Sequence, residues 1–427
     1  MSSSYLVRGG VVLTLGARTQ NHAEADVLIE DGVITEIGQG LRARTAETID
    51  ASHAIIMPGF VDGHRRCRMS LFKNEGTLSP EGDPSPDVVY AGTLVSLLAA
   101  AEAGVTTVVD WYDGPAGGDH LDAALRAHAE SGMRTVFVMA PNHDPVETWR
   151  DTVARHGMMP SPTTSLAAGI RSIHGRGADD SKALWAAARD AGLRVHVIAG
   201  PSERDSFTGP SRDLLGANVT VAHCCGLSDS DLDALASSGA GVILTPTSDM
   251  TDGPGAPAVQ AFLDRGIRPG LGVDNDLLGP GDILAQMRAA ISVQHATYFD
   301  LKLAGKGGLP NLLTTRDVIK YGTIDGARAI GLGEVTGSIE VGKAADLIVL
   351  RTDKPNIHPV NDPIGAVVWG VDTSNLDVVL VGGQPLMRDG VLTSDTGRIR
   401  TLVNDARGRV GATAGSPPPE KTGWGDT

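Results

Sequence analysis

The chain has 427 residues, of which 41% are hydrophobic and 20% are charged, so it can form a large core and global disorder is excluded. Its 36 basic and 51 acidic residues give a formal net charge of −15, which opposes binding to nucleic acids and to anionic membranes. The sequence contains no apolar run of about 18 residues, so we expect no membrane span.

Both ends of the chain predict antiparallel β structure. Near the N-terminus, VRGGVVLTL (7–15) and ADVLIEDGVITEIG (25–38) alternate apolar and polar residues, with a turn at Asp31-Gly32. An Asp-Gly pair between two such runs is a strong hairpin signal. A similar alternation of apolar and polar residues occurs in ADLIVL (345–350) and in residues 376–393, which contain a second Asp-Gly turn. We therefore expect one β-sandwich built from both chain ends.

The middle of the chain alternates short apolar strands with Ala-rich helical stretches, most of which end at Gly. The eight predicted strands are 55–62, 104–111, 134–140, 168–173, 193–198, 218–223, 240–245 and 268–274. Eight βα units predict a (β/α)8 TIM barrel of the α/β class, with its site at the C-terminal strand ends. The alternative is an open doubly wound sheet. The expected divisions are 1–57 and 335–402 for the sandwich, 58–334 for the barrel and 403–427 for a mobile tail.

Polar residues gather where these strands end. The first strand leads into His64, Arg65, Arg66, Cys67 and Arg68, the sixth into His223, and the eighth into Asp274. A lone histidine at a strand end is usually structural. Several on one barrel rim indicate a site, because only that face needs them.

The motifs at these ends resemble those of the amidohydrolase superfamily, in its cytosine deaminase-like and atrazine chlorohydrolase-like branch. The matching segments are PGFVDGH (58–64), GVTTVVD (104–110), VAHCCGLSDSDLDAL (221–235), GLGVDND (270–276) and TGSIEVGKAADLIVL (336–350). The resemblance implies a barrel whose Zn²⁺ or Fe²⁺ is held by a His-x-His pair, a fifth-strand histidine and an eighth-strand aspartate. It also implies hydrolysis by an activated water.

Two of the four implied metal ligands are missing. His64 takes the first position of the pair, but Arg66 takes the second, and a guanidinium cannot donate a lone pair to a metal. Ile198 stands at the fifth-strand position, with His196 two residues earlier. His223 and Asp274 take their implied positions.

Three hypotheses follow from this loss. In the one that we favour, no cofactor is expected, Arg66 contacts Asp274, and His64 and His223 serve acid–base chemistry. In the second, His64, His223 and Asp274 form a rebuilt Zn²⁺ site, with His174, His196 and the thiols of Cys67, Cys224 and Cys225 as further candidates. In the third, the protein is a non-catalytic ligand-binding relative.

Further residues are expected to contact the substrate, and two segments are candidate lids. The predicted contacts are Arg68, Asp110, Trp111, His143, His174 and Asp249. The candidate lids, 65–90 and 250–257, are rich in Gly and Pro.

The expected function is C–N hydrolysis or deamination-type chemistry on a small, polar nitrogen compound, cyclic or otherwise, or a carboxylate. A metal-independent lyase, isomerase, cyclase or decarboxylase is the alternative. Three cysteines do not make a disulfide framework, which favours a cytoplasmic location. A small-molecule substrate is the expected partner, with neither nucleic acid nor membrane, and a homodimer stays open.

Overall fold

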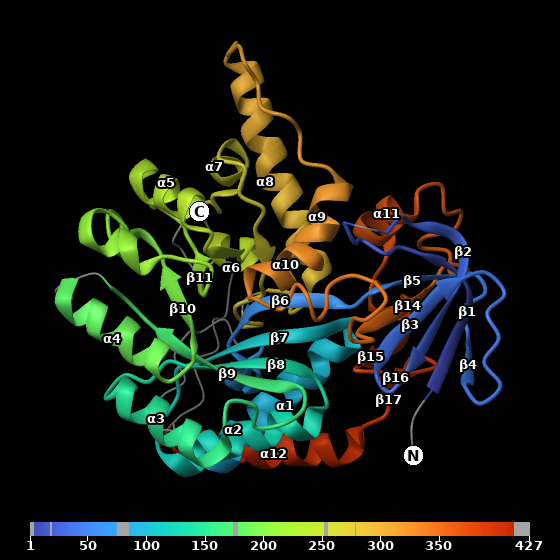
Figure 1. The fold of residues 1–427 in the computed structure, drawn as a ribbon, viewed down its shortest axis with the longest axis horizontal. Coiled ribbons are helices and arrows are strands. Elements are labelled where there is room, and N and C mark those ends of the chain that lie inside the picture. The colour runs from blue at the N-terminus through green and yellow to red at the C-terminus, as the bar shows by residue number, and fades with distance from the viewer. Residues whose placement is uncertain are drawn as a thin grey trace, which may run out of the picture.

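The computed structural model describes residues 4–17, 19–74, 85–173, 178–251, 255–277 and 279–413. A parallel barrel fills one side of the molecule, and a sheet formed by both chain ends lies against it (Figure 1). This arrangement confirms the predicted (β/α)8 barrel with a β unit made from both ends. None of the described helices combines the length and the apolar character needed to cross a membrane.

In the described residues, eight parallel strands form the barrel in consecutive order. They are β6 (Phe60–Arg65), β7 (Val105–Tyr112), β8 (Arg134–Met139), β9 (Thr164–Ile170), β10 (Arg194–Ala199), β11 (Val219–His223), β12 (Gly241–Leu244) and β13 (Gly270–Leu271). A parallel bridge between Arg65 and Asp274 joins the first strand end to the last. Closure therefore brings the segment that carries His64 beside the segment that carries Asp274.

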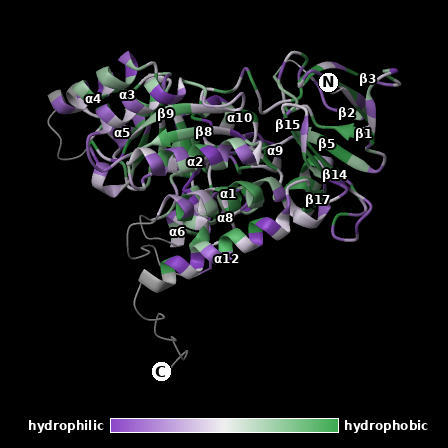
Figure 2. Cartoon of the chain, turned by 90° about the horizontal axis from the view of Figure 1, so that it is seen from below, coloured by the Kyte–Doolittle hydropathy of each residue, from purple (hydrophilic) through white to green (hydrophobic). Residues whose placement is uncertain are grey.

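Helices surround the barrel strands, as expected for this fold (Figure 1). They are α1 (Pro86–Glu102), α2 (Gly118–Ser131), α3 (Pro145–His156), α4 (Ala178–Asp190), α5 (Asp229–Ser238), α6 (Pro246–Thr251), α7 (Val259–Asp264), α8 (Ile283–Leu303), α9 (Thr315–Tyr321) and α10 (Ile324–Ala329). A capping box at Ser228 begins α5, and left-handed Gly132 and Gly239 end α2 and α5. The strands are largely apolar and the surrounding helices mix apolar and polar residues (Figure 2), and the main core joins residues of both.

Within the same described ranges, the terminal sheet has nine strands. These are β1 (Ser4–Val12), β2 (His22–Glu30), β3 (Val33–Gly38), β4 (Glu47–Asp50), β5 (Ala54–Pro58), β14 (Leu347–Arg351), β15 (Leu376–Val381), β16 (Gln384–Arg388) and β17 (Val391–Leu392). Strand β5 pairs with β1 on one side and with β14 on the other. The two chain ends are therefore joined through β5.

A single residue, Gly59, separates β5 from the first barrel strand. A Cβ atom at this position would come within 2.1 Å of the Thr106 side chain, so only glycine fits without a shift. The Gly59 N–H donates to the Asp346 carbonyl, and the Phe60 N–H donates to the Gly104 carbonyl. The terminal sheet therefore continues directly into the strand that bears His64.

The segment after the terminal sheet differs from the expected mobile tail. Helix α12 (Thr396–Thr413) covers the first eleven positions of the predicted tail 403–427 and packs against α1. Its apolar Leu402, Val403 and Ala406 join buried clusters with η1 (Cys67–Phe72) and α1, which explains why this part is ordered. Residues 414–427 lie outside the described residues. The short elements η2 (Pro201–Glu203), η3 (Gly209–Leu214), α11 (Pro363–Gly365), η4 (Ala366–Gly370) and η5 (Thr373–Asn375) complete the described structure.

Candidate active site

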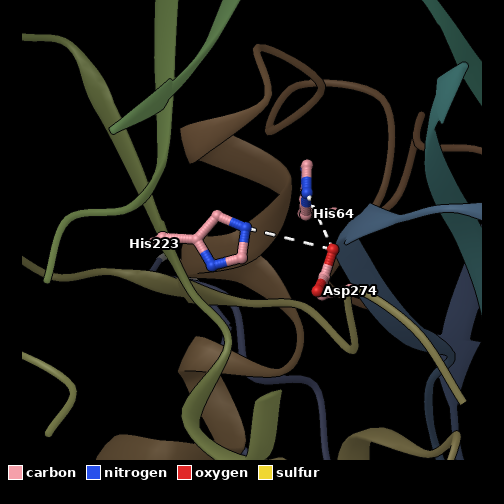
Figure 3. A group of neighbouring side chains, drawn as sticks. All are labelled: His64, His223 and Asp274. Carbon is pink, nitrogen blue, oxygen red and sulfur yellow. Dashed lines mark ion pairs between the residues drawn. The ribbon is translucent and has the colours of Figure 1, made fainter. Parts of the chain in front are cut away.

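Three buried side chains converge at the C-terminal ends of the barrel strands. His64 comes from β6, His223 from the end of β11, and Asp274 from the segment after β13 (Figure 3). The Asp274 Oδ1 atom lies 3.4 Å from His64 Nε2 and 3.9 Å from His223 Nε2. The three donor atoms all lie within 4.8 Å of one another. The sequence-based expectation that these three residues share one site fits this geometry.

The backbone at this site adopts a conformation that side chains rarely tolerate. His223, Cys224 and Asp274 have φ angles of 68°, 65° and 62°, in the left-handed region. Such a conformation costs a non-glycine residue about 1–3 kcal/mol and is concentrated at functional sites. Two of the three converging residues are therefore held in place at a cost to stability, which supports a functional role.

Asp274 is held by neutral donors on one oxygen and by a cation on the other. Ser248 Oγ donates to its Oδ2 at 2.7 Å, and Asn275 Nδ2 donates to the same atom at 2.8 Å. The predicted contact with Arg66 is present, since Arg66 Nε lies 3.0 Å from Oδ1. Burial opposes the charged form, but the Arg66 charge and the His64 hydrogen bond keep the pKa of Asp274 well below its usual value.

His223 is oriented by a carboxylate behind it. Its Nδ1 lies 2.8 Å from Asp249 Oδ1, and the Thr245 hydroxyl lies 2.8 Å from the same nitrogen. Burial lowers the pKa of His223, but the Asp249 hydrogen bond and the charges of Asp274 and Asp249 outweigh burial and raise it. Burial lowers the pKa of His64, which favours its neutral form. Nδ1–H of His223 can thus donate to Asp249, with Nε2 turned toward Asp274.

The three converging residues fit a divalent cation in number, and their ligand atoms, within 4.8 Å of one another, lie slightly wider apart than around a bound ion. Catalytic zinc sites use three protein ligands, and two ligands ~2.0–2.1 Å from one ion lie ~3.3–3.4 Å apart at a tetrahedral angle. In the described structure, His64 Nε2, His223 Nε2 and Asp274 Oδ1 are buried and make no well-aligned hydrogen bond, although His64 Nε2 and Arg66 Nε approach Asp274 Oδ1 at 3.4 Å and 3.0 Å. The Asp249 contact also suits a ligand, because metal-binding histidines usually donate their other N–H to a carboxylate. This donor set favours Zn²⁺ over the expectation of no cofactor.

A pocket of about 260 Å³ opens beside these residues. Since ligand pockets span about 300–1,000 Å³, this volume suits a small ligand. The lining residues are Arg66, Met69, Ile198, Ala199, Gly200, His223, Ser248, Asp274, Asn275 and Leu277. Ile198 therefore faces the pocket, as its alignment with a ligand position implied, but it contributes only an apolar surface.

Several predicted substrate contacts have other partners. Asp110 accepts a hydrogen bond from the Cys67 N–H at 3.0 Å and pairs with His128 Nε2 at 2.9 Å, so both of its oxygens have protein partners. Asp249 is fully buried and orients His223, so it acts on the site through that histidine. Trp111 is buried with its ring 5.7 Å from the His64 ring, which makes it a packing partner of that histidine.

The other predicted residues divide between the rim, the surface and the part of the chain that is not described. Arg68 donates to Asp113 Oδ1 through Nε at 3.2 Å and Nη2 at 3.0 Å. His143 is exposed and does not line the pocket. His174, with parts of both candidate lids, lies outside the described residues.

The cysteine thiols and His196 lie apart from the three converging residues. Burial raises the pKa values of Cys67, Cys224 and Cys225, which favours their protonated form. His196 is buried on β10, and burial lowers its pKa well below the usual value. The cluster of potential metal ligands includes none of these four residues.

Sequence reasoning placed Asp113 at a strand end without assigning it a role, and it missed Arg171; both lie beside Arg66. Arg171 Nη1 lies 3.6 Å from Asp113 Oδ2, the atom that Arg66 Nη1 approaches at the same distance. The fourth strand was predicted as 168–173, but β9 ends at Ile170. Arg171 therefore lies at the strand end, where its role could have been recognised with the correct boundary.

Comparisons with known proteins agree with this architecture. Residues 55–386 match the family model described as "Amidohydrolase family". The chain is 27% identical to a 5-methylthioadenosine/S-adenosylhomocysteine deaminase of Acetivibrio thermocellus over 95% of this chain and 99% of that protein. It is 28% identical to a 5'-deoxyadenosine deaminase of Methanosarcina barkeri, covering 90% of this chain and 93% of that one.

Solved structures share the fold over nearly the whole chain. An atrazine chlorohydrolase from Arthrobacter aurescens, complexed with zinc, has a TM-score of 0.81 at 21% identity and covers 94% of this chain and 100% of its own. An adenosine deaminase from Xanthomonas campestris with bound zinc has a TM-score of 0.80 at 18% identity, covering 96% of this chain and 99% of that one.

Proposed function

Since the chain belongs to the amidohydrolase family and is a hydrolase of that family, we propose that it deaminates a small nitrogen heterocycle. Water would add to a ring carbon that bears an amino group, and the C–N bond would break to give a carbonyl and ammonia. The observation that carries the proposal is the convergence of His64, His223 and Asp274 beside a small pocket. Adenosine-type deaminases among the relatives support an aminoheterocycle as substrate.

We assign the metal to the three converging residues, with His64 Nε2, His223 Nε2 and Asp274 Oδ1 as its ligands. When bound, a cation such as Zn²⁺ lowers the pKa of a coordinated water from 15.7 to about 7, which supplies hydroxide at neutral pH. The carboxylates that raise the pKa of His223 create a site that favours positive charge, whether from a proton or from a metal. The expectation of a metal-independent enzyme is therefore not retained as the main proposal.

The remaining roles belong to side chains around the pocket. Asp274 is ionised and can take a proton from the attacking water and return it to the departing amine. Arg66 lines the pocket and can stabilise negative charge that develops on the substrate. Asp249 and Thr245 position His223, while Ser248 and Asn275 hold Asp274 by its other oxygen.

Chemistry without a metal is a second candidate because Arg66 already contacts the proposed ligand atom of Asp274. A guanidinium can offset charge but cannot generate hydroxide, so this arrangement would suit an elimination, isomerisation or decarboxylation better than hydrolysis. The two candidates differ in metal content and in product.

The test is elemental analysis of protein purified without chelator, followed by an ammonia-release assay over a panel of aminoheterocycles. We expect about one divalent metal per chain, and ammonia equimolar with the carbonyl product. Loss of activity on chelation and recovery on adding Zn²⁺ would support the metal assignment. An active protein without metal would refute it, and a panel without ammonia release would refute deamination.

A further inference from the structure

Three arginines, of which Arg66 lines the pocket, surround one buried carboxylate. Arg66 follows β6, Arg68 lies in η1, and Arg171 follows β9, so three separate elements bring them together. Asp113, which follows β7, is the shared partner. This concentration of positive charge contrasts with a chain whose formal net charge is −15. We call these four residues the arginine cluster.

The charges of the cluster do not cancel among its members and Asp274. Arg68 neutralises Asp113 through two hydrogen bonds to one oxygen. Arg66 is matched by Asp274, 3.0 Å from its Nε. Arg171 is then the surplus cation, and its contact with Asp113 is loose at 3.6 Å. The arginine cluster and Asp274 together therefore contain three arginines and two carboxylates, which leaves one positive charge in excess.

Another carboxylate near Arg171 in the structure, that of Glu203, forms hydrogen bonds with the two residues that follow Arg171 in the sequence. Glu203, the last residue of η2, is buried and accepts hydrogen bonds from the N–H of Ile173 at 3.1 Å and from the hydroxyl of Ser172. Salt-bridge partners of Arg171 within the described ranges include Asp113 but not Glu203. The surplus charge of Arg171 thus remains after this acid is considered.

The surplus cation is accessible and adjacent to the reaction centre. The Arg171 side chain is 42% exposed, and that of Arg66 is 32% exposed. Their Nη1 atoms approach the same oxygen of Asp113, so the two planar groups lie close enough for one small anion to reach both. Arg66 also lines the pocket and contacts Asp274. An anion held here would lie at the edge of the catalytic pocket.

We propose that Arg171 and Arg66 form a subsite for a carboxylate group of the substrate. A guanidinium fork pairs with a carboxylate through parallel N–H···O bonds, and a single negative charge matches the surplus of one. This inference rests on the proposed function only in placing that carboxylate on an aminoheterocycle. The anion site itself requires no turnover.

The first experiment measures anion binding without catalysis. Trifluoroacetate is titrated into the purified enzyme and followed by ¹⁹F NMR, with trifluoroacetamide as the neutral analogue. We expect saturable binding of the anion alone, weakened about 10-fold by Arg171→Gln and less by Arg171→Lys, which keeps the charge but loses the fork. Arg316→Gln, a matched loss of an exposed arginine that pairs with Asp362, should leave binding unchanged.

Three outcomes would overturn the subsite. These are equal binding of the amide and the anion, an Arg171→Gln variant that binds trifluoroacetate like the wild type, and tighter binding of inorganic phosphate, which contradicts the single-charge match. Thermal melting of each variant checks its fold. Arg171 is exposed, so both replacements are expected to fold.

The second experiment links the subsite to turnover. Among compounds that release ammonia, a carboxylate-bearing aminoheterocycle should have a higher kcat/KM than its carboxamide, and Arg171→Gln should abolish the difference mainly through KM. If the enzyme binds the anion but releases ammonia from none of the compounds, the proposed function is refuted and the anion subsite is still supported. Ammonia release with no preference for the carboxylate would overturn the substrate assignment alone.

Discussion

Replacing Arg65 by methionine tests how the barrel positions His64. Arg65 is fully buried, in contrast to its neighbour Arg66. Its Nε donates to Asp62 Oδ2 at 2.7 Å, and its Nη2 donates to the Gly281 carbonyl at 2.6 Å. Asp62 Oδ1 accepts the Val273 N–H at 3.0 Å. The pair therefore links β6 to the segment that carries Asp274.

The expected loss of stability is large because the pair is shielded from water. The side chains of Arg65 and Asp62 are 1% and 0% exposed, so solvent does not weaken the interaction between their charges. Removing one partner of such a pair costs about 3–5 kcal/mol, out of a typical free energy of unfolding of about 5–15 kcal/mol. Methionine retains most of the apolar length of arginine, so the loss of stability in Arg65→Met measures the contribution of charge and hydrogen bonding.

A double variant separates the ion pair from packing. Asp62→Asn removes the charge and keeps an oxygen for the Val273 N–H. In Asp62→Asn/Arg65→Met no uncompensated charge remains, so we expect it to be about 2 kcal/mol more stable than the sum of the single losses predicts. Arg316→Met, which breaks an exposed pair with Asp362, is the matched control and should cost less than about 1 kcal/mol.

The assay is urea unfolding followed by circular dichroism, with Zn²⁺ binding measured under native conditions. Burial raises the pKa of Asp62 and Arg65 opposes this, so without Arg65 the folded state should take up a proton more readily. The deficit of Arg65→Met should therefore shrink as the pH falls. A loss below about 1 kcal/mol, or strictly additive losses in the double variant, would refute this account of the buried pair.

Three further predictions concern the pocket and its rim. Asp274→Asn should lower kcat by at least about 100-fold, because it removes a proposed proton acceptor and metal ligand; wild-type turnover would exclude both roles. Arg66→His should raise Zn²⁺ affinity by about 10-fold or more in a metal titration, since it removes a cation next to Asp274 and adds an imidazole. Arg66→Gln is the control for charge alone and should raise Zn²⁺ affinity less. An equal rise in Zn²⁺ affinity in both variants would show that the imidazole does not bind the metal. Burial opposes the ionised form of Asp113, but the charges of Arg66, Arg68 and Arg171 lower the pKa of its carboxyl group in the folded protein. The ionised carboxylate therefore stabilises the fold at pH values above about 3.9, the pKa in the unfolded chain. This stabilisation is lost as the pH falls through the lower pKa of the folded state. The stability difference between wild type and Asp113→Asn should thus hold from pH 7 to about 5 and shrink below about 4; a difference unchanged at pH 3 would contradict it.

The barrel could be predicted from the sequence because its signals are local. Alternating apolar strands and Gly-ended helices predicted the order of the elements, and β7, β8, β10 and β11 lie within one residue of their predicted bounds at each end. The convergence of His64, His223 and Asp274 was expected because all strands of a parallel barrel end on one face.

The partners of each side chain could not be predicted in this way. Asp249 was expected to meet the substrate, but it turns behind His223, and Asp110 is occupied by His128. Adjacent arginines also separate, since Arg65 enters the barrel wall while Arg66 enters the pocket. These outcomes depend on contacts between residues far apart in the sequence, which a periodic pattern does not encode.

The direct continuation of β5 into β6 has a practical consequence for anyone who shortens this protein. Strand β5 is held between β1 from one terminus and β14 from the other, although no residue of these strands lines the pocket. Deleting either terminus to improve expression would loosen the support of the strand that ends at His64. Reduced turnover in such a truncated protein would then reflect a misplaced imidazole and not a missing catalytic group.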